Sequence, residues 1–196
     1  MSPRYAELQI TTNFTFLEGA SHPEEMAGRA AVSGLAAFAI TDRNSFAGIV
    51  RAHVTAKEAG SRFIVGVRLD LQDGISLLAY PTDRAAYGRL CRLITAGRRR
   101  AEKGQCELYR VDVLEFAEGS LFIALPPEVP DEAFVTELRG WAQALPGRLY
   151  LALSHQHRGD DDSRMARLSD LAFRCAVTTV AVGDVLMHTQ IGRAHV

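Results

Sequence analysis

The chain has 196 residues, 47% of them hydrophobic and 23% charged, and a formal net charge of −1 at pH 7. This length fits one domain, which buries about 70% of the surface that its unfolded form exposes. No stretch approaches the ~20 apolar residues of a membrane span, so we expect no membrane partner. The near-neutral charge gives no general attraction to nucleic acid, so any role on DNA must be local or supplied by another part of the protein. No basic, apolar leader precedes Tyr5, and we expect a cytoplasmic protein.

The cysteines Cys91, Cys106 and Cys175 are widely spaced and form no C-x-x-C pair. Such pairs are typical of structural zinc sites and of dithiol redox centres. We therefore expect three buried free thiols without a chemical role.

The first predicted strand ends in polar residues, within the stretch 9–13. The next segment resembles a capping box, in which Ser21 is the N-cap and the Glu24 side chain returns to the Ser21 amide. The pattern predicts a helix from there to Ser33, and Gly34 suits the left-handed position that closes a helix.

The apolar run "LAAFAIT" predicts a strand that is buried on both faces. A helix over 46–59, closed by Gly60, leads to the strand "RFIVGVRLDL" at 62–71, and Asp73-Gly74 predicts a turn into the strand at 75–80. Leu90, Leu93 and Ile94 have the spacing of one buried helix face. The later predicted elements are helices at 82–95, 111–119, 131–145 and 161–176, and strands at 120–125, 148–153 and 178–182.

This alternation of about seven short strands with helices favours parallel pairing through right-handed crossovers. No glycine-rich dinucleotide loop follows the first strand, which argues against an open doubly wound sheet. We predict an α/β fold, a distorted (β/α)7 barrel with parallel strands and helices outside. In such barrels the chemistry lies at the carboxyl ends of the strands. Those ends are 9–13, 41–44, 68–70, 125–127, 154–158 and 183–188.

Three stretches, "ELQITTNFTFLEGASHPEEM", "GLAAFAITDRNSFAG" and "FIVGVRLDL", resemble the opening motifs of the PHP (polymerase and histidinol phosphatase) domain. The similarity is closest to the amino-terminal domain of bacterial error-prone DNA polymerases of the replicative C family. Two further stretches, "LAYPTDRAAYGRLCRLITAGRRRAEKGQCEL" and "SHQHRGDD", are similar to that branch. The resemblance implies a PHP-type barrel domain over 4–188. We expect 189–196 to be a tail foreign to the family, from truncation or artefact, and the chain to be a fragment.

Catalytic PHP domains hold divalent metals that hydrolyse phosphoesters, mostly through histidines at the strand ends. The resemblance places the corresponding positions on residues that are mostly unable to bind a metal. These positions are Gln9, Thr11, Glu18, Arg43 beside Asp42, Arg68, the stretch 74–76, Leu125, Asp184 and Leu186. Only Glu18 and Asp184 keep a metal-binding side chain. The resemblance therefore implies a degenerate site without a cofactor, and magnesium only in the polymerase portion of a longer parent.

Arg43 and Arg68 carry permanent positive charges where the family has metal ligands. Carboxylates gathered at a barrel mouth repel one another, and a guanidinium matches their geometry. We therefore predict a salt-bridged plug in which Arg43 and Arg68 pair with Glu18 and Asp184. Asp42 and Glu7 are further candidate partners.

Other charged stretches have ordinary explanations beside functional ones. His155 and His157 have the spacing of a metal pair, but they also fit solvated residues before an acidic helix start. The acidic runs 24–25 and 160–162 lie at predicted helix starts, where the helix dipole favours negative charge. The basic run 98–100, followed by Lys103, fits solvated surface, an interdomain contact or a DNA contact.

The leading hypothesis is a non-catalytic PHP domain of an error-prone, translesion DNA polymerase. Its partner is then the remainder of the polymerase chain, and it meets DNA only through the full-length protein. The parent would be a nucleotidyltransferase that copies damaged templates during repair, and we expect this fragment alone to be inactive. One alternative is a metal-dependent phosphoesterase or 3′-5′ nuclease with a remodelled site. Another is a stand-alone barrel that binds a partner or an anionic ligand at Arg43 and Arg68.

Overall fold

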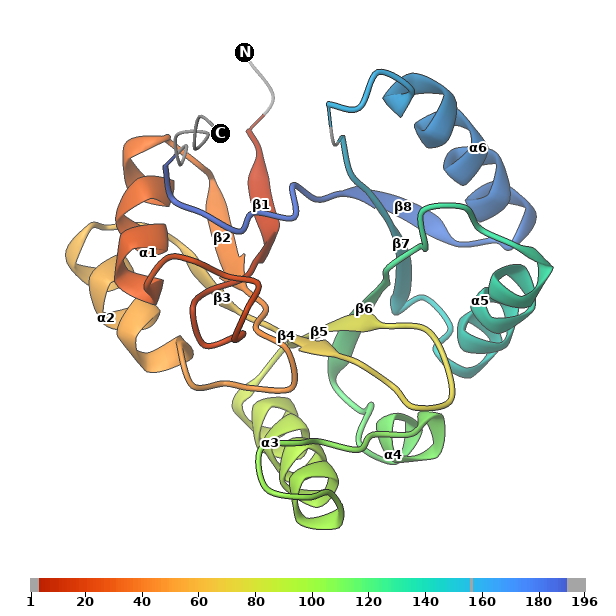
Figure 1. Ribbon diagram of the computed structural model, residues 1–196, viewed down its shortest axis with the longest axis horizontal. Helices are drawn as coiled ribbons and strands as arrows, with labels where there is room; N and C mark the ends of the chain where they lie inside the picture. The colour runs from red at the N-terminus through yellow and green to blue at the C-terminus, as the bar shows by residue number, and fades with distance from the viewer. Residues whose placement is uncertain (1–3, 156, 190–196) are drawn as a thin grey trace, which may run out of the picture.

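The structure, a computed structural model, describes residues 4–155 and 157–189 (Figure 1). Strands and helices alternate along most of the chain, as predicted. The strands are β1 (Ala6–Ile10), β2 (Ala37–Ile40), β3 (Phe63–Val65), β4 (Val67–Leu69), β5 (Leu77–Pro81), β6 (Ser120–Ala124), β7 (Leu149–Leu153) and β8 (Thr178–Ala181). The helices are α1 (Pro23–Val32), α2 (Ile49–Glu58), α3 (Arg84–Arg100), α4 (Arg110–Glu115), α5 (Glu132–Ala144) and α6 (Asp161–Arg174).

The strands form two sheets, so the structure confirms the α/β fold but not the closure of the distorted (β/α)7 barrel that we predicted. The first has the order β1-β2-β3 and the second the order β4-β5-β6-β7-β8. The two sheets adjoin at both ends, because β3 runs on into β4 and because Ile10, the last residue of β1, forms a parallel bridge with Val185 after β8. The Thr11 amide donates to the Val185 carbonyl at 2.9 Å, and the Val185 amide donates to the Gln9 carbonyl at 2.9 Å. In Figure 1 the strands form a ring, and the helices lie outside it.

Strand β5 is antiparallel to both of its neighbours, β4 and β6, so the prediction of uniformly parallel strands was wrong. Seven residues separate β4 from β5, whereas a parallel crossover needs a dozen or more. The predicted turn at Asp73-Gly74 is therefore part of a hairpin connection. As a result, the amino end of β5, with Ser76 before it, lies beside the carboxyl ends of the other strands.

The predicted strand over 62–71 is broken into β3 and β4 at Gly66. A Cβ on Gly66 would lie 2.8 Å from the Thr41 side chain and 2.9 Å from the Tyr80 ring. Only glycine fits at this close approach. At Gly66 the chain leaves the first sheet and enters the second.

Several helix boundaries differ from the predictions: α2 begins at Ile49 rather than at 46, and α4 ends at Glu115 rather than at 119. The N-cap of α1 is His22 rather than Ser21, and its amide donates to Glu25 at 2.7 Å. The Ser21 hydroxyl instead lies 2.7 Å from the His188 ring across the fold, so a tertiary contact displaced the cap by one residue. Helix α3 continues to Arg100, beyond the predicted end at 95. Gly34 and Gly60 close α1 and α2 with positive φ angles of 67° and 66°, as predicted.

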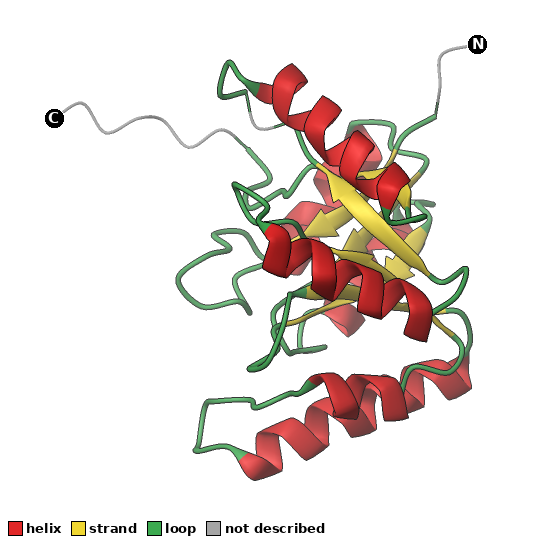
Figure 2. Cartoon of the chain, turned by 90° about the vertical axis from the view of Figure 1, so that its right-hand side faces the viewer, coloured by secondary structure: helices red, strands yellow, loops and turns green. Residues whose placement is uncertain are grey.

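Apolar side chains pack in three groups. One group joins α1 and α2 to the first sheet around Phe38 and Ile40, and a larger one joins α3, α5 and α6 to the second sheet around Phe122 and Trp141. The third fills the inside of the ring, and its members are Ala39, Leu78, Tyr80, Ile123, Ala152 and Val182. Figure 2 shows helices crossing the outside of the strands. No helix of the described residues is long and apolar enough to cross a membrane.

Candidate functional site

The predicted site residues lie at one end of the ring, where strands β1, β2, β4, β6, β7 and β8 end. Three of them, Glu18, Arg43 and Arg68, form what we call the arginine cluster together with Asp70, which our sequence analysis did not single out. The Arg43 guanidinium contacts Glu18 and lies 2.5 Å from Asp70. The Arg68 Nε donates to the other Asp70 oxygen at 2.8 Å. One carboxylate therefore joins the two arginines.

Backbone pairing brings the two arginines together. Arg43 and Arg68 form a parallel bridge, and the Asn44 amide donates to the Arg68 carbonyl at 2.7 Å. Asp70 stands two residues after Arg68, on the same side of the extended chain. The Ser76 hydroxyl donates to Asp70 at 2.6 Å, and the Asp70 amide donates to the Asn44 side chain at 3.1 Å. Asp70 is thus the centre of the cluster.

Glu18 reaches Arg43 from the loop between β1 and α1. The loop turns sharply at Leu17, whose φ is 67°, and passes close to the Thr12 backbone at Gly19. A Cβ on Gly19 would lie 2.1 Å from the Thr12 carbonyl oxygen, so no other residue fits there without moving the backbone. The stretch Leu17-Glu18-Gly19 therefore fixes the direction of the Glu18 side chain.

Asp42 is buried and lies outside the arginine cluster, contrary to its place among the candidate plug partners. It accepts hydrogen bonds from the Thr12 amide at 2.7 Å, the Thr12 hydroxyl at 2.7 Å and the Thr15 hydroxyl at 2.9 Å. Burial raises the pKa of the Asp42 carboxyl, and the Thr12 and Thr15 hydrogen bonds offset part of the rise. Threonines, not guanidinium groups, satisfy this carboxylate.

We predicted that Asp184 pairs with Arg43 or Arg68, but its side-chain partner in the structure is the amide of Gln9. The Gln9 Nε2 donates to Asp184 at 2.6 Å, and no ion pair joins Arg68 to Asp184 among the described residues. Burial raises the pKa of Asp184, while the charge of Arg68 acts in the opposite direction. Arg68 therefore influences Asp184 through space, but its nearest carboxylate is Asp70.

Glu7 also has no cationic partner in the part of the chain that the structure describes. This buried carboxylate accepts from the Tyr5 hydroxyl at 2.8 Å, the Gln9 amide at 2.8 Å and the Gly183 amide at 3.0 Å. These contacts join β1 to the segment after β8. Glu7 therefore stabilises the junction of the two sheets rather than a salt-bridged plug.

The remaining candidate ligand positions do not supply metal-binding atoms. Thr11 is buried, the exposed fraction of Leu186 is 36%, and the Leu125 amide donates to the Ser76 carbonyl at 3.0 Å. Within residues 4–155 and 157–189, no three side chains among His, Cys, Asp and Glu gather as a possible metal site. The donor set therefore does not fit the metal centre that the fold family implies, and we assign no chemical step to a metal.

The two histidines after β7 contact each other edge to face. The rings of His155 and His157 are 4.5 Å apart in an edge-on arrangement, and the His155 ring lies 3.8 Å from Asp161. Gln156, between them, lies outside the described residues. The acidic run that follows begins α6, as the sequence predicts for a helix start.

The basic run at the end of α3 is attached to the rest of the chain at two of its three arginines. Arg98 donates to the Asn44 carbonyl at 2.9 Å, beside the arginine cluster. Arg100 binds both oxygens of Asp112, at 2.7 and 2.9 Å, and this guanidinium holds the pKa of Asp112 below its usual range. Intramolecular contacts therefore account for Arg98 and Arg100.

The cysteines are free thiols, but only Cys175 is buried, so the prediction that all three are buried was wrong. Cys91 and Cys106 are partly exposed. Burial raises the pKa of the Cys106 thiol, which disfavours the reactive thiolate.

A cavity of about 160 Å³ opens beside the arginine cluster. Its lining includes Arg68, Asp184, Ser154 and Arg164, which projects from α6. Our sequence analysis missed Arg164. A signal was present, because Arg164 precedes Leu168 and Leu171 by four and seven residues and so occupies the apolar face of the helix.

Relatives of this chain are much longer proteins. The "Error-prone DNA polymerase" of Caulobacter vibrioides is 51% identical over 187 residues, which are 95% of this chain and 17% of the relative. The "Error-prone DNA polymerase 2" of Agrobacterium fabrum is 47% identical over 184 residues, which are 94% of this chain and 17% of the relative. The chain therefore spans about one sixth of the length of these relatives.

Solved structures share the fold at low identity. A putative metal-dependent phosphoesterase from Bifidobacterium adolescentis is 15% identical, with a TM-score of 0.70, over 95% of this chain and 88% of that one. An amidohydrolase from Chromobacterium violaceum, with bound sulfate and no metal, is 16% identical, with a TM-score of 0.67, over 93% of this chain and 87% of that one. These identities show the fold alone. The PHP domain model matches residues 7–144, from β1 through α5, which is more than half of the chain, and the chain therefore belongs to the PHP domain family.

Proposed function

We propose that this chain is the non-catalytic PHP domain of an error-prone DNA polymerase and that its role is structural. In this proposal the two sheets together are a distorted PHP-type barrel that packs against the remainder of the polymerase. The parent copies damaged templates in the cytoplasm, and its polymerase portion holds the magnesium. DNA contacts the full-length protein rather than this domain alone.

The arginine cluster is the observation that carries the proposal. Arg43 and Arg68 stand at positions where the family has metal ligands, and both contact Asp70. A guanidinium is always charged, so it repels a divalent cation at any physiological pH. Filling the mouth with these ion pairs supports a site that no longer performs hydrolysis.

The structural role is testable by association. The PHP domain of the Caulobacter vibrioides relative, which is 51% identical to this chain, is deleted, and this chain is supplied in trans. We expect the two pieces to copurify and the polymerase to regain activity and thermal stability. Copurification without any gain in stability, or no association at all, contradicts the structural role.

The absence of catalysis is testable on the chain alone. We expect less than one equivalent of zinc, manganese or iron after dialysis, measured by elemental analysis. We also expect no hydrolysis of p-nitrophenyl phosphate or of single-stranded DNA ends, with or without manganese. Hydrolysis that is lost in an Asp184→Asn variant, but kept in an Asp170→Asn control, would instead support the metal-dependent phosphoesterase or nuclease.

A further inference from the structure

A groove lies between α6 and the loop that leads from β6 to α5. Its volume is about 290 Å³. The buried side chains of Leu168 and Leu171 give it an apolar floor, and Val129 and Pro130 form the wall on the side of the loop. Among the described residues of its lining, only Arg164 also lines the cavity at the mouth of the ring. The groove is therefore a surface separate from that cavity.

Three arginines of α6 line the groove, and two of them have no anionic partner in the part of the chain that the structure describes. The exposed fraction of Arg164 is 8%, and its Nε and Nη1 atoms are buried without a hydrogen-bond partner. Arg167 is exposed and forms no ion pair within residues 4–155 and 157–189. Arg174, by contrast, lies 3.2 Å from Asp170. Burying an unpaired guanidinium is costly, so we expect Arg164 to meet an anion in the working protein.

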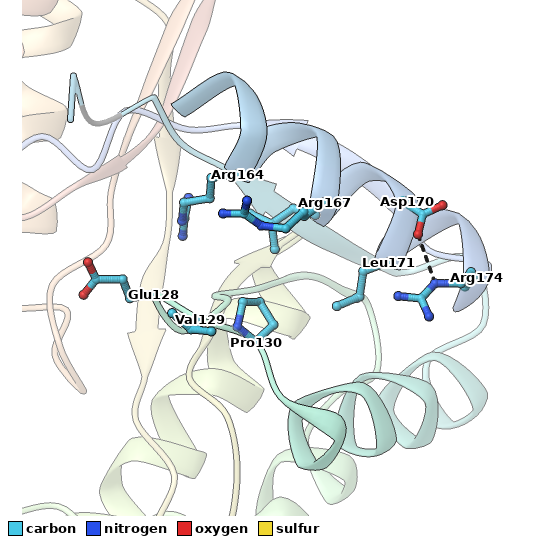
Figure 3. Close-up of a pocket in the computed structure, with 9 residues that line it drawn as sticks. Glu128, Val129, Pro130, Arg164, Arg167, Asp170, Leu171 and Arg174 are labelled. Carbon is cyan, nitrogen blue, oxygen red and sulfur yellow. Dashed lines mark ion pairs between the residues drawn. The ribbon is translucent and has the colours of Figure 1, made fainter. Parts of the chain in front are cut away.

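The carboxylate on the opposite wall of the groove is bound elsewhere. Glu128 accepts from Arg158, which is not part of the lining, at 2.7 Å. Figure 3 shows Arg164 and Arg167 extending from α6 on the side of Glu128. The groove therefore combines an excess of positive charge with an apolar floor.

This combination fits a peptide segment that carries a carboxylate. A guanidinium binds a carboxylate through two parallel hydrogen bonds. Val129, whose exposed fraction is 80%, and Leu171 offer apolar surface that a small inorganic anion would leave in contact with water. A segment with Asp or Glu beside an apolar residue satisfies the charge and covers this surface.

The small size of the groove favours a partner that is held nearby by other contacts. Stable complexes of separate proteins bury about 1,200–2,000 Å² in total, which is more than a short peptide stretch in this groove provides. The matched residues make up only 17% of the length of the Caulobacter vibrioides relative. A segment of the same polypeptide is present at a high effective concentration, so a small contact is enough to hold it.

We infer that this groove docks an acidic segment from the remainder of the polymerase. A carboxylate of the segment pairs with Arg164 and Arg167, and an adjacent apolar side chain packs on Val129 and Leu171. The inference rests on the structural role proposed above, and it adds the surface that makes the contact and the chemistry of the segment that fills it.

The test measures the association of this chain with the Caulobacter vibrioides relative from which the PHP domain is deleted, by isothermal titration calorimetry. We expect Arg167→Glu to weaken the association by about tenfold or more, because it replaces a pairing charge with a repelling one. Arg164→Met is expected to weaken it to a similar extent. Arg139→Glu, the same charge reversal at an exposed position of α5 outside the groove lining, is expected to associate as the parent does. The Tm of each variant shows whether it is folded.

A photo-crosslinker identifies the segment. We expect p-benzoylphenylalanine in place of Val129 to crosslink to a stretch of the relative that carries Asp or Glu next to an apolar residue. Changing that acidic residue to arginine is then expected to restore binding by Arg167→Glu. No crosslink, a crosslink to a stretch without an acidic residue, or a crosslink to a second copy of this chain overturns the inference.

Failure of this inference is distinguishable from failure of the structural role. If the parent associates and both groove variants associate equally well, the acidic contact is wrong while the structural role stands. If the parent does not associate, both are wrong. Equal weakening by Arg139→Glu would show a dependence on net charge alone and would also overturn the inference. If Arg164→Met does not fold, Arg167→Glu decides the question.

Discussion

Arg68 and Arg164 line the same cavity but have opposite surroundings. Arg68 is the middle residue of β4, and its backbone pairing with Arg43 after β2 brings both arginines beside Asp70. Arg164 lies on the buried face of α6, and its Nε and Nη1 have no partner. The difference shows that a guanidinium on a strand of this fold is stabilised by a carboxylate on a neighbouring part of the sheet edge, as Asp70 stabilises Arg68. A helix that faces the core supplies no such neighbours.

The largest effect is expected from Asp70→Asn, which removes the carboxylate shared by both arginines. Asparagine keeps the shape but leaves two guanidinium groups close together without the carboxylate that they share, and among the described residues only Arg43 keeps another carboxylate partner, Glu18. Since the exposed fraction of the Asp70 side chain is 24%, we expect a loss of about 2–3 kcal/mol in the free energy of unfolding, below the range for fully buried pairs. Urea unfolding measures it. A loss below about 0.5 kcal/mol, typical of exposed pairs, would show that the cluster is not a structural unit.

The second effect is the difference in stability between variants of Arg68 and Arg164. Arg68→Met is expected to lower the free energy of unfolding by about 1–2 kcal/mol, because Asp70 keeps Arg43 and Ser76 as partners. Arg164→Met, measured in the same buffer as Arg68→Met, is expected to leave the free energy of unfolding unchanged or to raise it. Equal losses for the two variants would remove the distinction between a paired and an unpaired guanidinium.

The third effect is a pH dependence of the free energy of unfolding that arises from Asp42. This carboxylate is buried and lies outside the arginine cluster. Because the pKa of Asp42 is raised in the folded protein, its carboxylate disfavours folding once the pH exceeds the unfolded pKa of about 4. The parent is therefore expected to lose stability relative to Asp42→Asn as the pH rises from about 4 to 7. Unfolding curves for both proteins across this range measure the change. A relative gain by the parent would mean that a cation reaches Asp42.

The smallest effect is expected on the outer face of α6. Asp170→Asn breaks an exposed ion pair with Arg174, four residues along the helix. Such pairs contribute about 0.2–0.5 kcal/mol, so the change in the free energy of unfolding stays within that range. The variant serves as the control for Asp70→Asn, since both remove one negative charge. A loss comparable to that of Asp70→Asn would show that net charge, rather than pairing, controls stability.

Local patterns predicted most of the elements and missed what depends on distant neighbours. Gly34 and Gly60 close their helices as predicted, because a positive φ is a property of the residue itself. The α1 cap moved from Ser21 to His22, because Ser21 contacts His188 at the other end of the chain. The antiparallel β5 was missed although the short connection at Asp73-Gly74 already excluded a parallel crossover.

The sequence by itself determined the alternation of strands and helices, the family resemblance, and the expectation that Arg43 and Arg68 replace metal ligands of the family. Those features reside in residue identity and spacing. The tertiary structure alone decided that Asp70 joins the two arginines, that threonines satisfy Asp42, and that Gln9 contacts Asp184. It also decided that Arg164 is buried beside a cavity. The physical reason is that ion pairing acts over a few ångströms, and strand order and register set which charges come that close.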